Sequence, residues 1–158
     1  MDNSGRVLGV DYGSRRVGVA MSDSMRMVAT PLETISVASD KQALRRLREL
    51  VAAHDIQAVV IGLPLHMDGG RGELAEAADG FAERLGKQVP KLAVHLWDER
   101  LSTAEAERAM RSDTAKAGRR KDVRDQLAAQ LILQSWLDAQ AGPLPLDAWG
   151  EGIDDDLF

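Results

Sequence analysis

Three acidic residues lie at positions where a purely structural role explains a carboxylate poorly. Asp11 ends an apolar segment, Glu99 follows another, and Asp125 falls on the apolar stripe of a predicted helix. Carboxylate oxygens are the ligands that Mg²⁺ and Mn²⁺ prefer in proteins. If the three side chains converge, they form an oxygen-ligand site for a divalent metal ion.

Each of these acids also has a purely structural explanation. Asp11 could anchor a turn through its side chain, and Glu99 could favour the N-terminus of a following helix. At about 100° per residue, Asp125 lies within about 20° of Ile132 and Trp136, so it needs a partner in partial burial. The nearby cations that could provide an ion pair are Arg120, Lys121 and Arg124.

The apolar periodicity predicts an alternation of strands and helices. Strands are expected at 6–10, 16–21, 28–37, 57–62 and 92–97. Helices are expected at 39–54, 73–87, 102–111 and 120–140, and the segments 39–42 and 102–105 match the capping box that begins a helix. The order βββαβαβαα indicates a mixed sheet of about five strands flanked by helices, which is the α/β class.

Composition predicts one globular domain at 1–140 and a short acidic tail. The chain has 158 residues, of which 44% are apolar, and a formal net charge of −5. Residues 141–158 contain five acids and no Lys or Arg, so the preceding residues sum to zero. With its Pro and Gly residues and no periodicity, the tail is predicted to be disordered.

Cysteine is absent, which excludes disulfides, thiolate chemistry and Cys-based zinc sites and fits a reducing compartment. No apolar segment approaches the roughly 18 residues that a membrane span needs. We therefore expect a cytoplasmic protein with no membrane partner.

Basic residues gather in the segment that leads into Asp125. Clustered Lys and Arg side chains attract the phosphates of nucleic acid, although they can also form an ordinary solvated surface. This cluster contains Arg111, Lys116, Arg119, Arg120, Lys121 and Arg124. Further candidates for phosphate contacts are Arg15, Arg16, Arg71 and Arg100.

Six segments in order resemble the YqgF family, also called RuvX-like. They are 9–13 (GVDYG), 16–20 (RVGVA), 29–32 (ATPL), 60–64 (VIGLP), 98–103 (DERLST) and 125–129 (DQLAA). Members of this family are described as Holliday junction resolvases or as nucleases of the precursor of small-subunit ribosomal RNA. The resemblance covers nearly everything before the acidic tail.

The resemblance implies a ribonuclease H-like fold with Asp11, Glu99 and Asp125 as catalytic, metal-binding acids. It further implies an endonuclease using Mg²⁺ or Mn²⁺ that trims the 5′ end of pre-16S rRNA in ribosome biogenesis or cuts branched DNA. Ribosomal precursor particles are possible partners, and the chain is expected to be a monomer or a homodimer. His66 stands where relatives are expected to carry Asn, which puts the role of that position in question.

Two other functions remain open at this stage. An Asp-x-Gly hairpin followed by an Arg-containing strand is similar to the phosphate loop of actin-like and sugar-kinase phosphotransferases, but one domain of this length offers half of their cleft. A non-catalytic module for nucleic-acid binding or ribosome assembly would keep the acids for structure.

Overall fold

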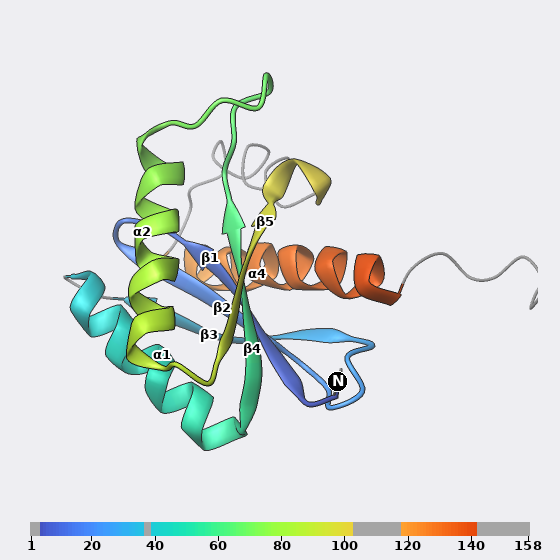
Figure 1. Cartoon of the computed structure of the whole chain (residues 1–158). Helices are drawn as coiled ribbons and strands as arrows, with labels where there is room; N and C mark the ends of the chain where they lie inside the picture. Colours follow the sequence, from blue (N-terminus) through green and yellow to red (C-terminus); the bar gives the residue numbers. More distant parts are fainter. Residues whose placement is uncertain (1–3, 37–38, 103–117, 142–158) are drawn as a thin grey trace, which may run out of the picture.

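A five-stranded sheet lies between two helices on one face and one long helix on the other (Figure 1). The computed structural model of the chain describes residues 4–36, 39–102 and 118–141, with side chains in the last range described from residue 123 onward. The strand order is β3-β2-β1-β4-β5, in which β1 pairs antiparallel with β2 and parallel with β4. The predicted mixed α/β sheet is confirmed.

The observed elements match the predicted ones to within about two residues. The strands are β1 (Arg6–Tyr12), β2 (Arg16–Ser22), β3 (Ala29–Ser36), β4 (Ile56–Leu63) and β5 (Ala93–Asp98). The helices are α1 (Asp40–His54), α2 (Glu73–Gln88), the short 3-10 turn η1 (Glu99–Leu101) and α4 (Gly118–Ala141). The helix predicted at 102–111 and nearly all of the acidic tail lie outside the described residues.

The start of α1 confirms the first capping box. The Ser39 hydroxyl accepts a hydrogen bond from the backbone N–H of Gln42 at 3.3 Å, which satisfies one of the free donors at the helix N-terminus. Leu44, Leu47 and Leu50 then recur on the buried side of the helix. The helix therefore packs against the sheet along one apolar stripe.

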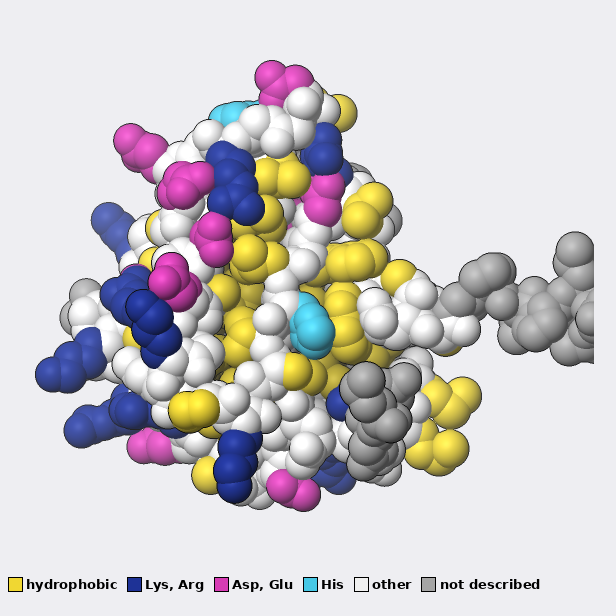
Figure 2. Space-filling model, viewed as in Figure 1, with side chains coloured by type: hydrophobic (Ala, Val, Ile, Leu, Met, Phe, Trp, Pro, Cys, Tyr) yellow, Lys and Arg dark blue, Asp and Glu magenta, His cyan; other side chains and the backbone are white. Residues whose placement is uncertain are grey.

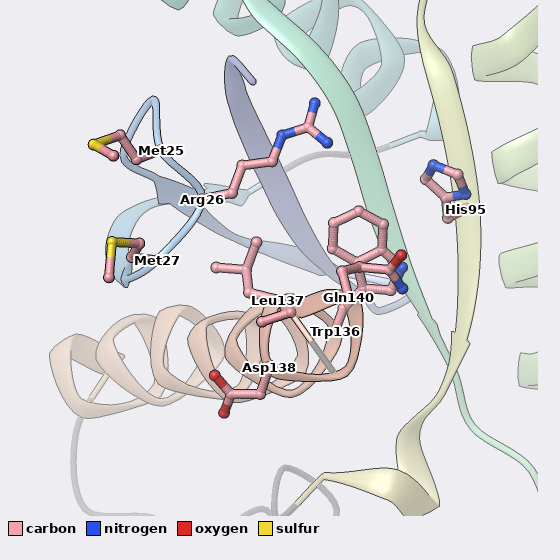
Figure 3. Close-up of a pocket in the computed structure, with 9 residues that line it drawn as sticks. Met25, Arg26, Met27, His95, Trp136, Leu137, Asp138 and Gln140 are labelled. Carbon is pink, nitrogen blue, oxygen red and sulfur yellow. The ribbon is translucent and has the colours of Figure 1, made fainter. Parts of the chain in front are cut away.

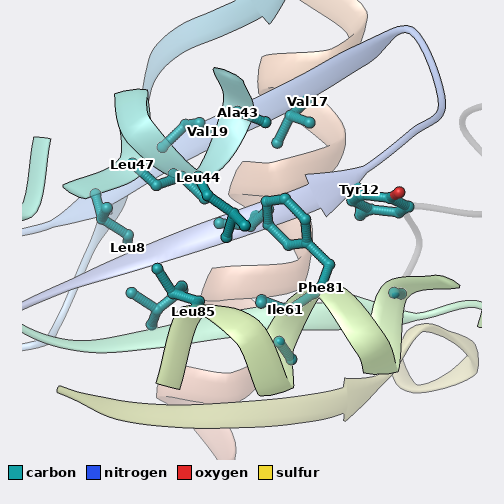
Figure 4. Close-up of a cluster of buried hydrophobic side chains, with 14 of the residues drawn as sticks. Leu8, Tyr12, Val17, Val19, Ala43, Leu44, Leu47, Ile61, Phe81 and Leu85 are labelled. Atoms are coloured by element: carbon teal, nitrogen blue, oxygen red, sulfur yellow. The ribbon is translucent and has the colours of Figure 1, made fainter. Parts of the chain in front are cut away.

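Alternation along β1 divides the core into two parts. Leu8, Val10 and Tyr12 point toward α1 and α2, where they join the larger apolar cluster (Figure 4). Val7 points toward the opposite face, where it joins the cluster that includes buried side chains of α4. Because side chains alternate along a strand, Asp11 projects on the α4 face of the sheet.

Polar contacts attach α4 to both edges of the sheet. The Gln130 side-chain amide donates to the carbonyl of Ala29 at the start of β3, and the Ala29 N–H donates to the Gln134 side chain, each at 2.9 Å. At the other edge, the indole N–H of Trp97 in β5 donates to the Ser135 hydroxyl at 3.0 Å. Each such bond contributes about 1 kcal/mol, so together they fix how α4 crosses the sheet.

The side of the molecule at edge strand β5 is mainly apolar. Figure 2 shows yellow side chains gathered around β5 between α2 and α4, while most of the Lys and Arg side chains in this view lie over α1 and α2. Val94 and Leu96 of β5 are partly buried against the core. Among the described residues, no helix has both the length and the apolar character that crossing a membrane requires.

Tyr12 connects the sheet to α1 through a hydrogen bond that also helps to raise the pKa of the tyrosine. Its hydroxyl donates to the carboxylate of Asp40 at 2.8 Å, and its ring packs on Phe81 with centroids 4.8 Å apart. Burial, followed by the hydrogen bond to Asp40, raises the pKa of Tyr12 to about 12. Between pH 10 and 12 the unfolded chain therefore loses this proton before the folded protein does, and stability falls as pH rises.

We predict that Tyr12→Phe lowers the free energy of unfolding at pH 7 by about 1 kcal/mol, because one hydrogen bond is lost while the ring packing is kept. The fall in Tm between pH 10 and 12 should be smaller in the variant than in the parent. Thermal melts followed by circular dichroism across this range provide the test. An equally steep fall in both proteins would contradict the assignment of this titration to Tyr12.

Candidate metal centre

Asp11 is buried on the α4 face near the C-terminal end of β1. It lies within the strand, in register with Gly18 of β2, rather than in the turn that follows, and it is 6% exposed. Val10 pairs with Ile61 in the parallel ladder between β1 and β4, so Asp11 lies level with Gly62 on the neighbouring strand. The carboxylate therefore lies on the central strand of the sheet, near the end at which the parallel strands β1 and β4 finish.

Glu99 reaches the same place from β5. It is the first residue after that strand, it is 1% exposed, and a Cβ added to Gly62 would lie 2.6 Å from its carboxylate Oε1. The Glu99 side chain thus lies over Gly62, the residue of β4 that is level with Asp11. The preceding acid, Asp98, accepts a hydrogen bond from the backbone N–H of Arg100, so helix capping explains Asp98 and leaves Glu99 without that role.

Asp125 approaches from α4, above β2. A Cβ added to Gly18 would lie 2.0 Å from the backbone oxygen of Asp125 and 3.0 Å from its Cβ. Because Gly18 pairs with Asp11, the structure brings Asp11 and Asp125 to adjacent positions, and both line one open pocket of about 390 Å³. Within the described ranges, no three His, Asp or Glu side chains are close enough together to form a ready metal site.

The carboxylate of Asp125 is held by an arginine. The Arg16 Nε donates to Asp125 Oδ2 at 2.7 Å, and the two side chains are 35% and 19% exposed. Asp125 therefore has an ion pair, as one alternative predicted, but the partner comes from β2 rather than from the basic residues that precede it in the helix. Arg16 lies two residues before Gly18 on the same face of β2, the face that α4 contacts at Asp125.

The residues predicted to contact nucleic acid fall into different environments. Arg15 is exposed, and both Arg15 and Arg16 line the pocket with Asp11. Arg71 instead pairs with Asp79 of α2 at 2.7 Å and with Glu76 at 3.6 Å. The side chains of Arg119, Arg120 and Lys121, in the first turns of α4, lie outside the described part of the chain, as do Arg111 and Lys116.

Arg100 holds the loop between β4 and α2. Its guanidinium pairs with Asp98 at 2.7 Å and donates to the carbonyl oxygens of His66 and Met67 at 3.4 and 3.2 Å. The Arg100 cation lowers the pKa of Asp98 below its usual value. His66 lies inside this loop, where a Cβ on Gly72 would approach its Nε2 to 3.0 Å. Arg71 and Arg100 thus fix a loop beside the acids.

A second pocket, of about 490 Å³, lies at the C-terminal end of α4. Figure 3 shows Arg26 extending across it toward His95, with Met25 and Met27 at its outer side. The His95 ring packs on Trp136 with centroids 5.2 Å apart, and burial, then the Arg26 charge, lowers the pKa of His95. Trp136 follows Asp125 by eleven residues of helix, about 16 Å along the axis, so this pocket is separate from the acids.

Glycines that contact the site were not identified from the sequence. Gly18 and Gly62 leave room for Asp125 and Glu99, because a side chain at either position would occupy the space of the acid. The available signal was a glycine inside an otherwise apolar strand, which marks a close approach of another group. The acids could be found from their positions at strand ends and on a helical stripe, whereas the groups opposite these glycines could not.

Comparison with known proteins shows the family of the chain and its fold. The family model described as "RuvX: Holliday junction resolvase" matches residues 5–139. A "Putative pre-16S rRNA nuclease" of Myxococcus xanthus is 43% identical over 138 residues, which is 87% of this chain and 91% of the relative. The protein of the same name from a Geobacillus species is 42% identical over 137 residues, covering 85% of this chain and 99% of the relative.

The fold is shared with a solved structure of Thermus thermophilus RuvC in complex with a Holliday junction substrate. The TM-score is 0.57 at 16% sequence identity, over 87% of this chain and 96% of RuvC. This similarity shows the ribonuclease H-like fold. The chain belongs to the RuvX (YqgF) family.

The contact at Gly18 can be tested by a matched pair of substitutions. Gly18→Ala should lower the free energy of unfolding by about 1–3 kcal/mol, because the new methyl group collides with the backbone of α4. Gly80→Ala, inside α2 with no atom within 4 Å of the added Cβ, should raise it by up to about 1 kcal/mol. Urea denaturation measures both values. Equal stability of Gly18→Ala and the parent would show that α4 does not approach β2 this closely.

Proposed function

We propose that this chain is a metal-dependent endonuclease that hydrolyses phosphodiester bonds in structured nucleic acid, with precursor 16S rRNA as its substrate. The observation that carries the proposal is the burial of Asp11 in β1 and of Glu99 directly after β5, on the same face and at the same end of the sheet as Asp125. An open pocket with Arg15 and Arg16 in its wall adjoins them.

The three acids fit a divalent metal by their chemistry. All would donate carboxylate oxygens, and the chain has no cysteine to favour a softer ion, so Mg²⁺ or Mn²⁺ suits the set. Burying two carboxylates at 6% and 1% exposure is costly for the ionised form, and a bound cation offsets that cost. When bound, two such ions lower the pKa of an attacking water and stabilise the charge on the leaving oxygen.

The protein itself would supply position and charge. Asp11 is held inside a paired strand and Glu99 against a glycine of β4, so neither side chain needs to reorganise much to act as a ligand. Arg15 and Arg16 would attract the phosphate backbone into the pocket. The loop that Arg100 fixes would form the wall beside Glu99.

Precursor 16S rRNA is the first choice of substrate because the similar relatives carry that name. A four-way DNA junction is the second, since the description of the family model names it. Paired incisions across a junction need two active sites, so this second activity would require a two-fold dimer. The two substrates can be compared in one assay.

We predict that Asp11→Asn lowers the rate of metal-dependent cleavage by at least about 10²-fold, the usual loss when one electrostatic stabiliser of a transition state is removed. The matched control is Asp55→Asn, which makes the same charge change at an exposed residue just before β4. Asp55 has a left-handed backbone conformation that Asn also adopts readily. The control should cleave at the parent rate.

The measurement is cleavage of matched pre-16S rRNA and four-way DNA junctions in Mg²⁺ or Mn²⁺, with circular dichroism to confirm folding. Parent-like cleavage by Asp11→Asn would refute the role of this acid. A folded parent that binds RNA but cuts neither substrate would instead support a non-catalytic assembly module.

A further inference from the structure

The ion pair between Arg16 and Asp125 places a protein cation at one of the proposed metal ligands. The donated bond is short, at 2.7 Å, and it uses the Oδ2 atom of Asp125. Asp125 is 19% exposed, so the interaction is shielded from solvent more than a surface ion pair. Arg16 also lines the pocket that contains Asp11.

A metal ion and this guanidinium would compete for the same carboxylate. Two cations near one carboxylate repel each other, and the repulsion is stronger in a partly buried site than in water. A metal that takes Oδ2 must first displace the Arg16 Nε, which ends a charge-assisted hydrogen bond. The ion pair therefore opposes metal binding at Asp125.

The alternative is that this ion pair only fastens α4 to β2. Other contacts already hold α4 on the sheet, because Gln130 and Gln134 bond to Ala29 in the edge strand β3 and Ser135 bonds to Trp97 in the edge strand β5. The apolar side of α4 is buried along the same length. Arg16 and Asp125, by contrast, lie at the wall of an open pocket, where a mobile ligand can reach them.

The geometry points to Arg16 as a positioning residue that occupies the cation site at Asp125 until a metal ion replaces it. This inference rests on the proposed metal-dependent function and adds a control over how tightly the ion binds. Once displaced, the Arg16 guanidinium is available in the pocket for a phosphate of the nucleic acid. Metal affinity is thus kept low in the protein without substrate.

The test is Mn²⁺ binding to the full chain without nucleic acid, measured by electron paramagnetic resonance of free Mn²⁺. Arg16→Gln should bind Mn²⁺ about three- to tenfold more tightly than the parent, the gain expected from removing one partly exposed charge-assisted competitor. Arg15→Gln is the matched control, because it removes the same charge from the same pocket and no ion pair involves Arg15 within the described part of the chain. Its affinity should change by less than about twofold.

Thermal melts give a second measurement that does not depend on catalysis. In EDTA, Arg16→Gln should have a lower Tm than the parent. Adding a fixed Mn²⁺ concentration should raise the Tm of Arg16→Gln by more than it raises the Tm of the parent, because tighter binding stabilises the folded state further. Arg16→Lys keeps the charge without the planar guanidinium and should fall between the two. This variant keeps the test open if Arg16→Gln folds poorly.

The outcomes separate this inference from the proposed function. Tight Mn²⁺ binding by the parent, lost in Asp125→Asn but unchanged or weakened in Arg16→Gln, would overturn the role of Arg16 and keep the metal site. If Arg16→Gln and Arg15→Gln raised the Mn²⁺ affinity equally, the effect would come from the net charge of the pocket. That result would also overturn the role of Arg16. Absence of Mn²⁺ binding in the parent and in every variant would overturn both proposals.

Discussion

The close packing of α4 on the sheet depends on glycine at three strand positions. A Cβ on Gly9 would lie 2.5 Å from the Cβ of Leu133, one on Gly62 would lie 2.7 Å from the Cδ1 of Ile132, and one on Gly18 would reach the backbone of Asp125. Because the interior is close-packed, a methyl group at Gly9 or Gly18 has to move the helix or the strand, and one at Gly62 has to displace the side chains of Ile132 and Glu99. The position of Asp125 relative to Asp11 therefore depends on the lack of a side chain at these glycines as well as on the side chains that pack between α4 and the sheet.

This packing explains how a small domain accommodates buried carboxylates. Asp11 and Glu99 are buried acids in a largely apolar interior, and the rule that charged groups stay at the surface is commonly broken at functional sites. The two apolar clusters on either side of the sheet and the hydrogen bonds of α4 to β3 and β5 hold together the elements that carry these acids.

Several charged residues have a structural role that their position in the sequence did not reveal. Arg71 and Arg100 pair with Asp79 and Asp98 and fix the chain around the loop before α2, and their contact with phosphates stays a prediction. Arg15 and Arg16 remain at the pocket with the acids. A positive charge can be read from the sequence, whereas the acid that faces it depends on which elements become neighbours.

The sequence by itself determined most of the elements and which acids could form a candidate site. Period-two alternation placed Asp11 on one face of β1, helical spacing placed Asp125 on the apolar stripe of α4, and the N-cap at Ser39 began α1 where it was predicted. Only the tertiary structure decided that Asp125 pairs with Arg16, 109 positions away, and that Glu99 lies over Gly62 beside Asp11. The physical reason is that periodicity reports which side of an element is buried, while the group opposite is set by strand order, register and the distance at which two surfaces pack.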